Sequence, residues 1–211
     1  LPDIDAGCAI YGIESLSMRR GITHGPIALI LLPLVLWALM LAFDRWQTRR
    51  DKRPARRLPI NKGWLLLLAY IGCFSHPALD WLNNYGIRLL EPFSPQWFYG
   101  DSIFIIDLWI WIALAASVWL SLRRERGGIA NWTRPAWVGF SAVGAHIFGN
   151  GLITGAAERM ASGALSASGH RDARVVASPP PLAFWKRDIF WRTADRYGTG
   201  NFIPGVGGNL D

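Results

Sequence analysis

Four long apolar stretches constrain this chain more than any other feature of its sequence. They cover residues 26–43, 63–82, 103–122 and 135–157. At a rise of about 1.5 Å per residue, a helix of each length approaches or exceeds the roughly 30 Å of a bilayer's hydrocarbon core. Helices buried in soluble proteins rarely run so far without a polar face. The pattern predicts an all-α integral membrane helical bundle of about four transmembrane helices.

The composition fits a chain that is solvated partly by lipid. Hydrophobic residues make up 51% of the chain and charged residues 18%, and there are 12 Trp in 211 residues. Trp favours the membrane–water interface, where its ring lies in apolar surroundings and its N–H stays hydrated. The net charge of +7 comes from basic residues that fall largely in two short loops. This placement indicates a lipid bilayer as the partner and argues against nucleic acid.

The two basic loops also predict the orientation in the membrane. They carry Arg45, Arg49, Arg50, Lys52, Arg53, Arg56, Arg57 and Lys62 in the first loop, and Arg123, Arg124, Arg126 and Arg134 in the other. The loop at residues 83–102 has only Arg88, against Glu91 and Asp101. By the positive-inside rule the basic loops are cytoplasmic. The N-terminal segment, residues 83–102 and the C-terminal tail are then expected outside the membrane.

The composition changes after residue 157. Residues 158–173 include a Ser/Ala/Gly run and predict a linker. Residues 174–177 and 188–192 predict short strands, and residues 197–200 predict a turn. We therefore expect a transmembrane domain at 1–157 and a small β-rich external module at 174–211. The opening Leu1-Pro2 and the Gly-rich end further suggest a piece of a longer protein.

Ionisable side chains within or beside the apolar stretches are costly, so each needs an explanation. Counted from Gly63 at the inner face, His76 lies about 20 Å across the membrane and Asp80 about 26 Å across. Asp107 enters from the outer face and lies about 6 Å deep, while His24 precedes the first stretch at its outer end. Side chains from three stretches thus lie at a similar depth, near the outer face of the membrane. This convergence predicts a functional site at the outer face.

His76 and Asp80 form the most suggestive pair. They are four residues apart, which places both on one face of a helix. An imidazole nitrogen and a carboxylate presented in this way can bind Zn²⁺ or a similar ion. The alternative is that Asp80 makes a hydrogen bond at the end of a helix, while the ring nitrogens of His76 have hydrogen-bond partners inside the bundle.

Five further residues have a candidate functional role, a simpler structural interpretation, or both. Asp3 and Asp5 present two carboxylates just after a proline, as metal ligands or as an ordinary charged turn. Arg20 is a candidate for facing an anionic group of a substrate. Asp101 can cap the third helix. For His146, a packing or supporting role is favoured over direct metal ligation.

Ordered motifs along the chain also resemble a known family. They are Leu1-Pro2-Asp3-Ile4-Asp5, Arg20-Gly21-Ile22-Thr23-His24, the run from Ser75 through Asp80 with the Tyr85–Phe93 segment, Gly100 to Asp107, and Val175 to Tyr197. Together they resemble the YdjM-like family of LexA-regulated, membrane-bound, metal-dependent hydrolases of bacteria.

The resemblance implies metal binding at Asp3, Asp5, His24, His76 and Asp80, in a bacterial inner membrane. Family members commonly carry His where this chain has Arg19; if that His is a metal ligand in them, one metal site is altered here. The resemblance also implies an upstream helical segment, so we expect the sequence to be a fragment of a longer protein without that segment.

These observations lead us to expect a metal-dependent hydrolase whose cofactor is a divalent ion, with zinc the first candidate. Asp107 is the candidate general base and Arg20 the candidate contact to an anionic group. The outer location suggests a phosphoester or lipid-headgroup substrate. The alternative is a non-enzymatic membrane protein with a structural metal site or an ion path. An open coordination position for water would distinguish the two, because structural zinc sites are closed.

Overall fold

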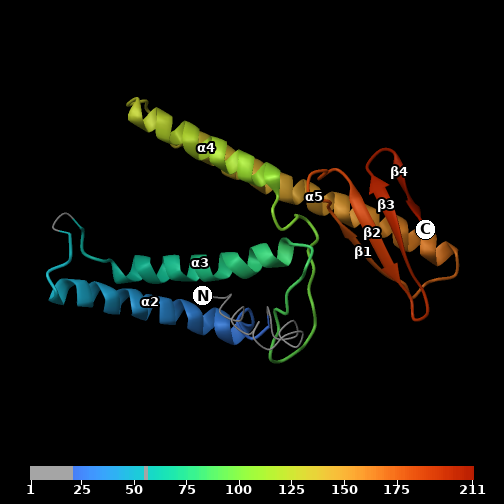
Figure 1. Ribbon diagram of the computed structural model, residues 1–211, viewed down its shortest axis with the longest axis horizontal. Coiled ribbons are helices and arrows are strands. Elements are labelled where there is room, and N and C mark those ends of the chain that lie inside the picture. Colours follow the sequence, from blue (N-terminus) through green and yellow to red (C-terminus); the bar gives the residue numbers. More distant parts are fainter. Residues whose placement is uncertain (1–20, 55–56) are drawn as a thin grey trace. The chain divides into compact units, whose positions relative to one another are not determined.

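The computed structural model describes residues 21–54 and 57–211, which form four helices followed by a four-stranded sheet (Figure 1). The chain divides into two compact units. The first contains helices α2 and α3 with the loop Tyr85–Tyr99. The second contains Leu82–Asn84 and Gly100–Asp211, and thus holds α4, α5 and the sheet.

Helices α2 (Pro26–Arg49) and α3 (Lys62–Leu82) form an antiparallel pair in the first unit (Figure 1). The Trp37 indole donates a hydrogen bond to the Lys62 carbonyl at 2.9 Å, and the Tyr70 hydroxyl donates one to the Ile30 carbonyl at 3.3 Å. From the first contact to the second, the residue number decreases along α2 and increases along α3, as expected for antiparallel helices. Pro26 suits the start of α2, where its missing N–H has no helical partner to lose. The first two predicted helices are therefore confirmed.

Three of the helices in the described residues are long and apolar enough to cross a membrane: α2, α3 and α5 (Arg134–Ala167). Helix α4 (Leu108–Arg126) is not among them. Residues 103–107 are not helical, so the apolar part of α4 spans residues 108–122, a length of roughly 22 Å. The prediction of a full span over 103–122 is therefore wrong at its N-terminal end.

Asp107 ends the loop before α4 by capping the helix. Its Oδ1 accepts hydrogen bonds from the backbone N–H groups of Trp109 and Ile110 at 3.0 and 3.1 Å. Such a cap satisfies donors that have no partner within the first turn. The cap is thus Asp107 rather than Asp101, and Asp107 immediately precedes the first residue of α4.

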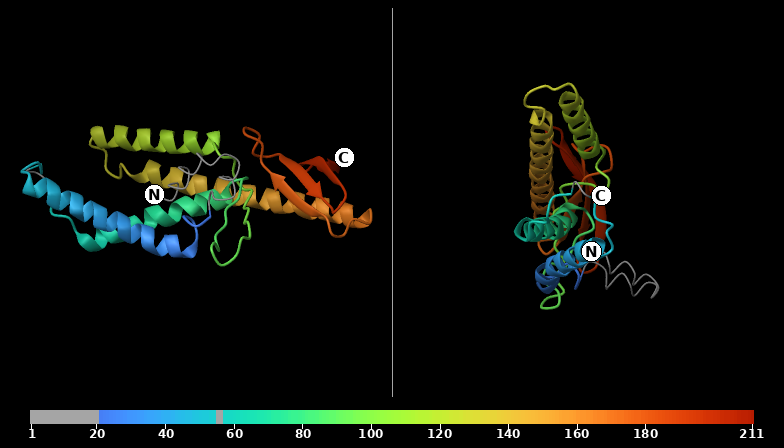
Figure 2. Two further views of the ribbon diagram at one scale, coloured as in Figure 1. Left: turned by 60° about the horizontal axis from the view of Figure 1, so that its bottom comes forward. Right: turned by 90° about the vertical axis from the view of Figure 1, so that its left-hand side faces the viewer.

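Helices α4 and α5 form an antiparallel hairpin, seen side by side in the left view of Figure 2. Gly139 of α5 faces Ser117 of α4, and a β-carbon at this position would overlap the serine side chain. Helix α5 continues through Ala167 for 34 residues. Residues 158–167, predicted as part of a linker, are therefore helical.

The C-terminal part of α5 packs against the sheet. Ala157 and Ala161 form a buried core with Ala177 and Ile189, and Met160 packs against it. The sheet covers these apolar α5 residues. The helix can therefore continue beyond residue 157, where the apolar stretch in the sequence ends. The expected helical core and small β module are both present, and they share α5.

The sheet consists of β1 (Arg174–Ser178), β2 (Arg187–Arg192), β3 (Tyr197–Ile203) and β4 (Gly207–Leu210), antiparallel and in that order. The two predicted strands are confirmed. The turn predicted at 197–200 is wrong, because these residues begin β3. A β-carbon at Gly198 would lie 2.5 Å from the Trp191 ring, and one at Gly200 would lie 2.8 Å from the Leu210 side chain. The glycines reflect close packing rather than a turn.

Candidate metal centre

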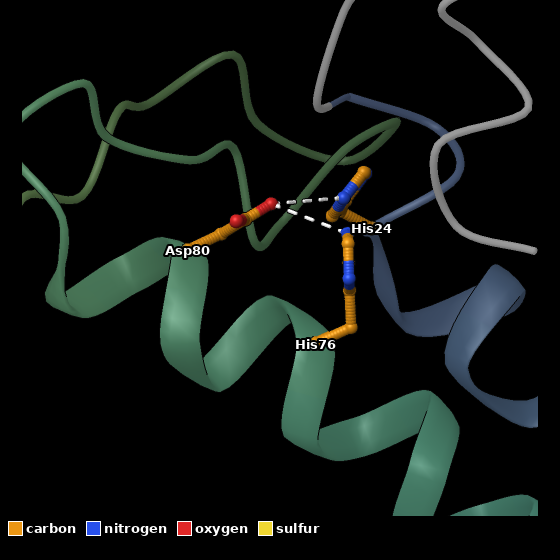
Figure 3. Close-up of side chains that lie close together, drawn as sticks. All are labelled: His24, His76 and Asp80. Carbon is orange, nitrogen blue, oxygen red and sulfur yellow. Dashed lines mark ion pairs between the residues drawn. The ribbon is translucent and has the colours of Figure 1, made fainter. Parts of the chain in front are cut away.

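His76 and Asp80 lie in the last two turns of α3 (Figure 3). Their four-residue spacing places both side chains on one face of the helix. Asp80 is buried and His76 is partly exposed. The end of α3 therefore presents a carboxylate and an imidazole side by side.

His24 approaches this pair from the turn that precedes α2 (Figure 3). Its backbone N–H donates to the Gly21 carbonyl at 2.9 Å, which closes the turn. Gly25 follows as the N-terminal cap of α2, and a β-carbon there would overlap the Glu91 carbonyl oxygen. The turn is thus held against the loop Tyr85–Tyr99, and the His24 side chain is fully buried.

The three side chains converge on one oxygen of Asp80. Its Oδ2 lies 3.3 Å from Nε2 of His24 and 3.5 Å from Nε2 of His76. The two imidazole centroids are 5.5 Å apart. One ligand atom from each residue can be chosen so that all three lie within 4.8 Å of one another.

These distances fit a metal ion. Zinc ligands at about 2.0–2.2 Å in a tetrahedron are about 3.4 Å from one another, which is close to the observed separations. Two imidazoles and a carboxylate are also a ligand set that zinc commonly takes. The His24, His76 and Asp80 group could therefore hold a divalent ion.

Two neighbouring hydroxyl groups orient the candidate ligands. Thr23 Oγ1 lies 2.8 Å from Nδ1 of His24, so an Nδ1–H can donate to it and leave the Nε2 lone pair directed at the centre. The Tyr85 hydroxyl donates to Oδ1 of Asp80 at 2.9 Å. In each residue the contact is made by a different atom from the one that faces the centre.

The predicted site residues thus have different outcomes. His24, His76 and Asp80 come together as expected. Asp3, Asp5 and Arg20 lie outside the described residues. Asp107 belongs to the second unit, where its Oδ2 lies 3.1 Å from Nε2 of His146.

His146 belongs to a polar cluster of the second unit. Asn150 Nδ2 lies 3.1 Å from its Nε2. The fully buried Arg187 donates to the Asn150 carbonyl at 2.6 Å and to Thr154 Oγ1 at 2.7 Å. Burial lowers the pKa of Arg187 to about 10, against the opposing effect of Asp101. His146 thus contacts Asp107 and Asn150, and its packing or supporting role stays a prediction.

Asp101 joins the same cluster on the side of the sheet. Its Oδ1 accepts a hydrogen bond from the Ser178 hydroxyl at 2.6 Å, and its carbonyl accepts one from Thr154 at 2.7 Å. Burial raises the pKa of Asp101, and the Ser178 hydrogen bond and the charge of Arg187 oppose this rise. The cluster ties the loop before α4, the middle of α5 and the sheet together.

Two residues of these sites were not anticipated from the sequence. Tyr85 lies beyond the end of α3, so helical spacing does not connect it with Asp80. Arg187 stands between Lys186 and Asp188, a pattern typical of an exposed charged turn. The signal for its burial was the alternation of Arg187 with Ile189 and Trp191, which places all three on one face of the strand.

Comparison with curated proteins and with solved structures finds no match. The sequence model of the YdjM inner membrane protein family matches residues 1–154, which is more than half of the chain. The chain therefore belongs to the YdjM inner membrane protein family.

Proposed function

We propose that this protein is a metal-dependent hydrolase of the inner membrane, with His24, His76 and Asp80 as ligands of a divalent ion. The supporting observation is the approach of three ligand atoms from two separate segments to separations that suit a tetrahedral ion. Zinc is the first candidate for the ion. By family resemblance, Asp3 and Asp5 would add carboxylate ligands, and Arg20 would face an anionic group of the substrate.

A divalent ion in this centre would lower the pKa of bound water and polarise a scissile phosphoryl or carbonyl group. The residues of the chain would hold and orient the reacting partners. An Nδ1–H of His24 that donates to Thr23 Oγ1 would set the tautomer in which Nε2 binds the ion, and the burial of His24 and Asp80 would keep bulk water from competing for the ligands. The proposed mechanism needs no contribution from Asp107, whose carboxylate caps α4 and faces His146.

The location of the centre supports a lipid-headgroup or phosphoester substrate. His24 precedes the first turn of α2, and Asp80 lies in the last turn of α3. Both helices are candidate membrane spans, and the centre lies at one end of the α2–α3 pair. A group at this level can meet the headgroup of a lipid whose chains remain in the bilayer.

Ligand removal in the purified full chain tests the proposal. His76→Ala and Asp80→Ala should each lose bound metal, measured by elemental analysis, and should lose hydrolysis by about 10³-fold. The substrates are a phosphodiester, a phosphomonoester and a lipid-linked phosphate. His170→Ala is the matched control, because His170 stacks on Trp191 in the second unit and should retain both metal and activity.

The outcomes separate the proposal from its alternative. Full hydrolysis by Asp80→Ala would end the hydrolase assignment at this centre. Stoichiometric metal in the wild type that depends on Asp80, with no turnover of any substrate class, would favour a structural metal site or an ion path.

A further inference from the structure

We propose that Tyr85 is a positioning residue of the metal centre, which holds the Asp80 carboxylate so that only one of its oxygens faces the ion. This inference rests on the proposed metal centre. The Tyr85 hydroxyl donates to Oδ1 of Asp80 at 2.9 Å. The other oxygen, Oδ2, is the one that lies 3.3 and 3.5 Å from the two histidine nitrogens.

The two oxygens of Asp80 therefore have separate tasks. The terminal torsion of an aspartate is broad and roughly two-fold, so a carboxylate without an anchor can rotate and exchange its oxygens. A hydrogen bond to Oδ1 limits this rotation and leaves Oδ2 directed toward His24 and His76, as Figure 3 shows for the ion pairs. Groups of this kind typically change metal affinity by about 10–100-fold when they are removed.

The loop Tyr85–Tyr99 supports the tyrosine independently of α3. Gly86 has a φ of +69°, a backbone conformation that residues other than glycine rarely adopt. A β-carbon at Gly86 would also overlap the ring of Tyr99. Ile87 and Phe98 exchange backbone hydrogen bonds of 2.9 and 2.8 Å, which close the loop. The Tyr85 hydroxyl is thus placed by the fold of the loop.

Tyr85 acts through Asp80 rather than on a substrate. Its hydroxyl lies on the carboxylate oxygen that is turned away from the histidines. Removal of the hydroxyl should weaken metal binding and change the coordination geometry, while the protein remains folded.

The test compares Tyr85→Phe with Tyr70→Phe in the purified full chain. Tyr70 is the matched control, because its hydroxyl also makes a hydrogen bond in the first unit, to the Ile30 carbonyl at 3.3 Å, away from the centre. The readouts are the Zn²⁺ dissociation constant, by competition with a chromogenic chelator, and the visible spectrum of the Co²⁺-substituted protein. Tyr85→Phe should raise the dissociation constant by about 10–100-fold and shift the Co²⁺ spectrum. Tyr70→Phe should do neither.

One result would overturn the role of Tyr85, and a different result would refute the metal centre. Wild-type affinity and an unchanged Co²⁺ spectrum in Tyr85→Phe would overturn the role of Tyr85, while loss of binding in Asp80→Ala would keep the metal centre itself. Equal Zn²⁺ binding by the wild type and Asp80→Ala would instead refute the centre on which the inference rests.

Discussion

The carboxylate of Asp107 shows how one side chain can serve two elements. One oxygen caps α4 through two backbone N–H groups, and the other lies 3.1 Å from His146 of α5. The sequence predicted an important group at this position because an acid beside an apolar stretch needs an explanation. The structure supplies that explanation through the cap and the histidine.

Asp107→Ala should therefore destabilise the protein more than Asp107→Asn. Alanine removes the cap, which costs about 1–2 kcal/mol, whereas asparagine caps about as well as aspartate. Unfolding in detergent, followed by circular dichroism, measures the difference. Equal destabilisation by the two variants would contradict the capping role. If Asp107→Asn kept its fold and its metal but lost turnover, the general-base hypothesis for Asp107 would return.

The position of His24 can be tested by adding one methyl group at Gly25. A β-carbon at Gly25 would overlap the Glu91 carbonyl oxygen, so Gly25→Ala must displace either the loop or the turn that carries His24. We expect metal affinity to fall by at least about tenfold, since the ligand moves from its position. Gly72→Ala in α3 is the control, because nothing lies within 4 Å of an added β-carbon. Unchanged metal affinity in Gly25→Ala would show that the turn can shift without moving His24.

At the scale of elements, α5 and the sheet depend on each other through Arg187. The guanidinium of this β2 residue is fully buried and donates to Thr154 and Asn150 of α5. It also donates to the Phe184 carbonyl at 2.7 Å in the β1–β2 connection. One side chain thus joins the helix, the strand and the connecting loop.

Arg187→Met should destabilise the second unit by about 3 kcal/mol, because it leaves buried acceptors and the charge of Asp101 without their partner. Arg192→Met on the same strand is the matched control, since Arg192 is exposed and should change stability by less than about 0.5 kcal/mol. Chemical unfolding and limited proteolysis of the tail measure the effect. A similar small loss in both variants would mean that Arg187 does not hold the sheet to α5.

Asp101 gives this cluster a defined pH dependence. Burial raises the pKa of Asp101 above its usual 3.8, so the folded state binds the proton more tightly than the unfolded state. The resulting stabilisation is complete below about 3.8 and is lost as the pH rises through the raised pKa. The free energy of unfolding of the wild type should therefore fall relative to that of Asp101→Asn over this interval. Parallel pH profiles for the two proteins would contradict a raised pKa.

The successes and failures of sequence-based prediction have physical causes at this scale. Helices α2 and α3 were predictable because lipid-compatible length and composition directly determine them. The start of α4 was not, because Ser102 and Ile103 donate backbone hydrogen bonds to the Leu82 carbonyl and are drawn into the loop. The helical continuation of α5 and the glycines of β3 depend on packing against the sheet, which no local pattern reports.

The candidate centre was predictable in part for a related reason. The spacing of His76 and Asp80 on one helix and the level of His24 at the end of another were visible in the sequence. The contact of Tyr85 with Asp80 required the fold of the loop Tyr85–Tyr99, because the residue lies beyond the reach of helical periodicity. Sequence reasoning thus found the three candidate ligands and missed the tyrosine that donates a hydrogen bond to one of them.

At the scale of the whole molecule, the antiparallel pairing of α2 and α3 fixes which end of the first unit carries the centre. His24 and Asp80 lie at one end of the pair, and the described basic residues within 45–53 and 57–62 lie at the other. Helix α2 has 24 residues, which corresponds to roughly 36 Å. If the pair spans the bilayer, the centre and the basic loop lie on opposite sides.

The basic loop should then be cytoplasmic and the centre should face the periplasm. Two exposed residues report on the two ends: Leu58 in the basic loop, which is 82% exposed, and Gln96 in the loop Tyr85–Tyr99. Cysteines introduced separately as Leu58→Cys and Gln96→Cys, with Cys8 and Cys73 replaced by serine, can be treated with an impermeant maleimide in intact cells. Gln96→Cys should react at once, and Leu58→Cys should react only after the membrane is permeabilised. The reverse order would place the metal centre in the cytoplasm, and an extracytoplasmic lipid or phosphoester could no longer be its substrate.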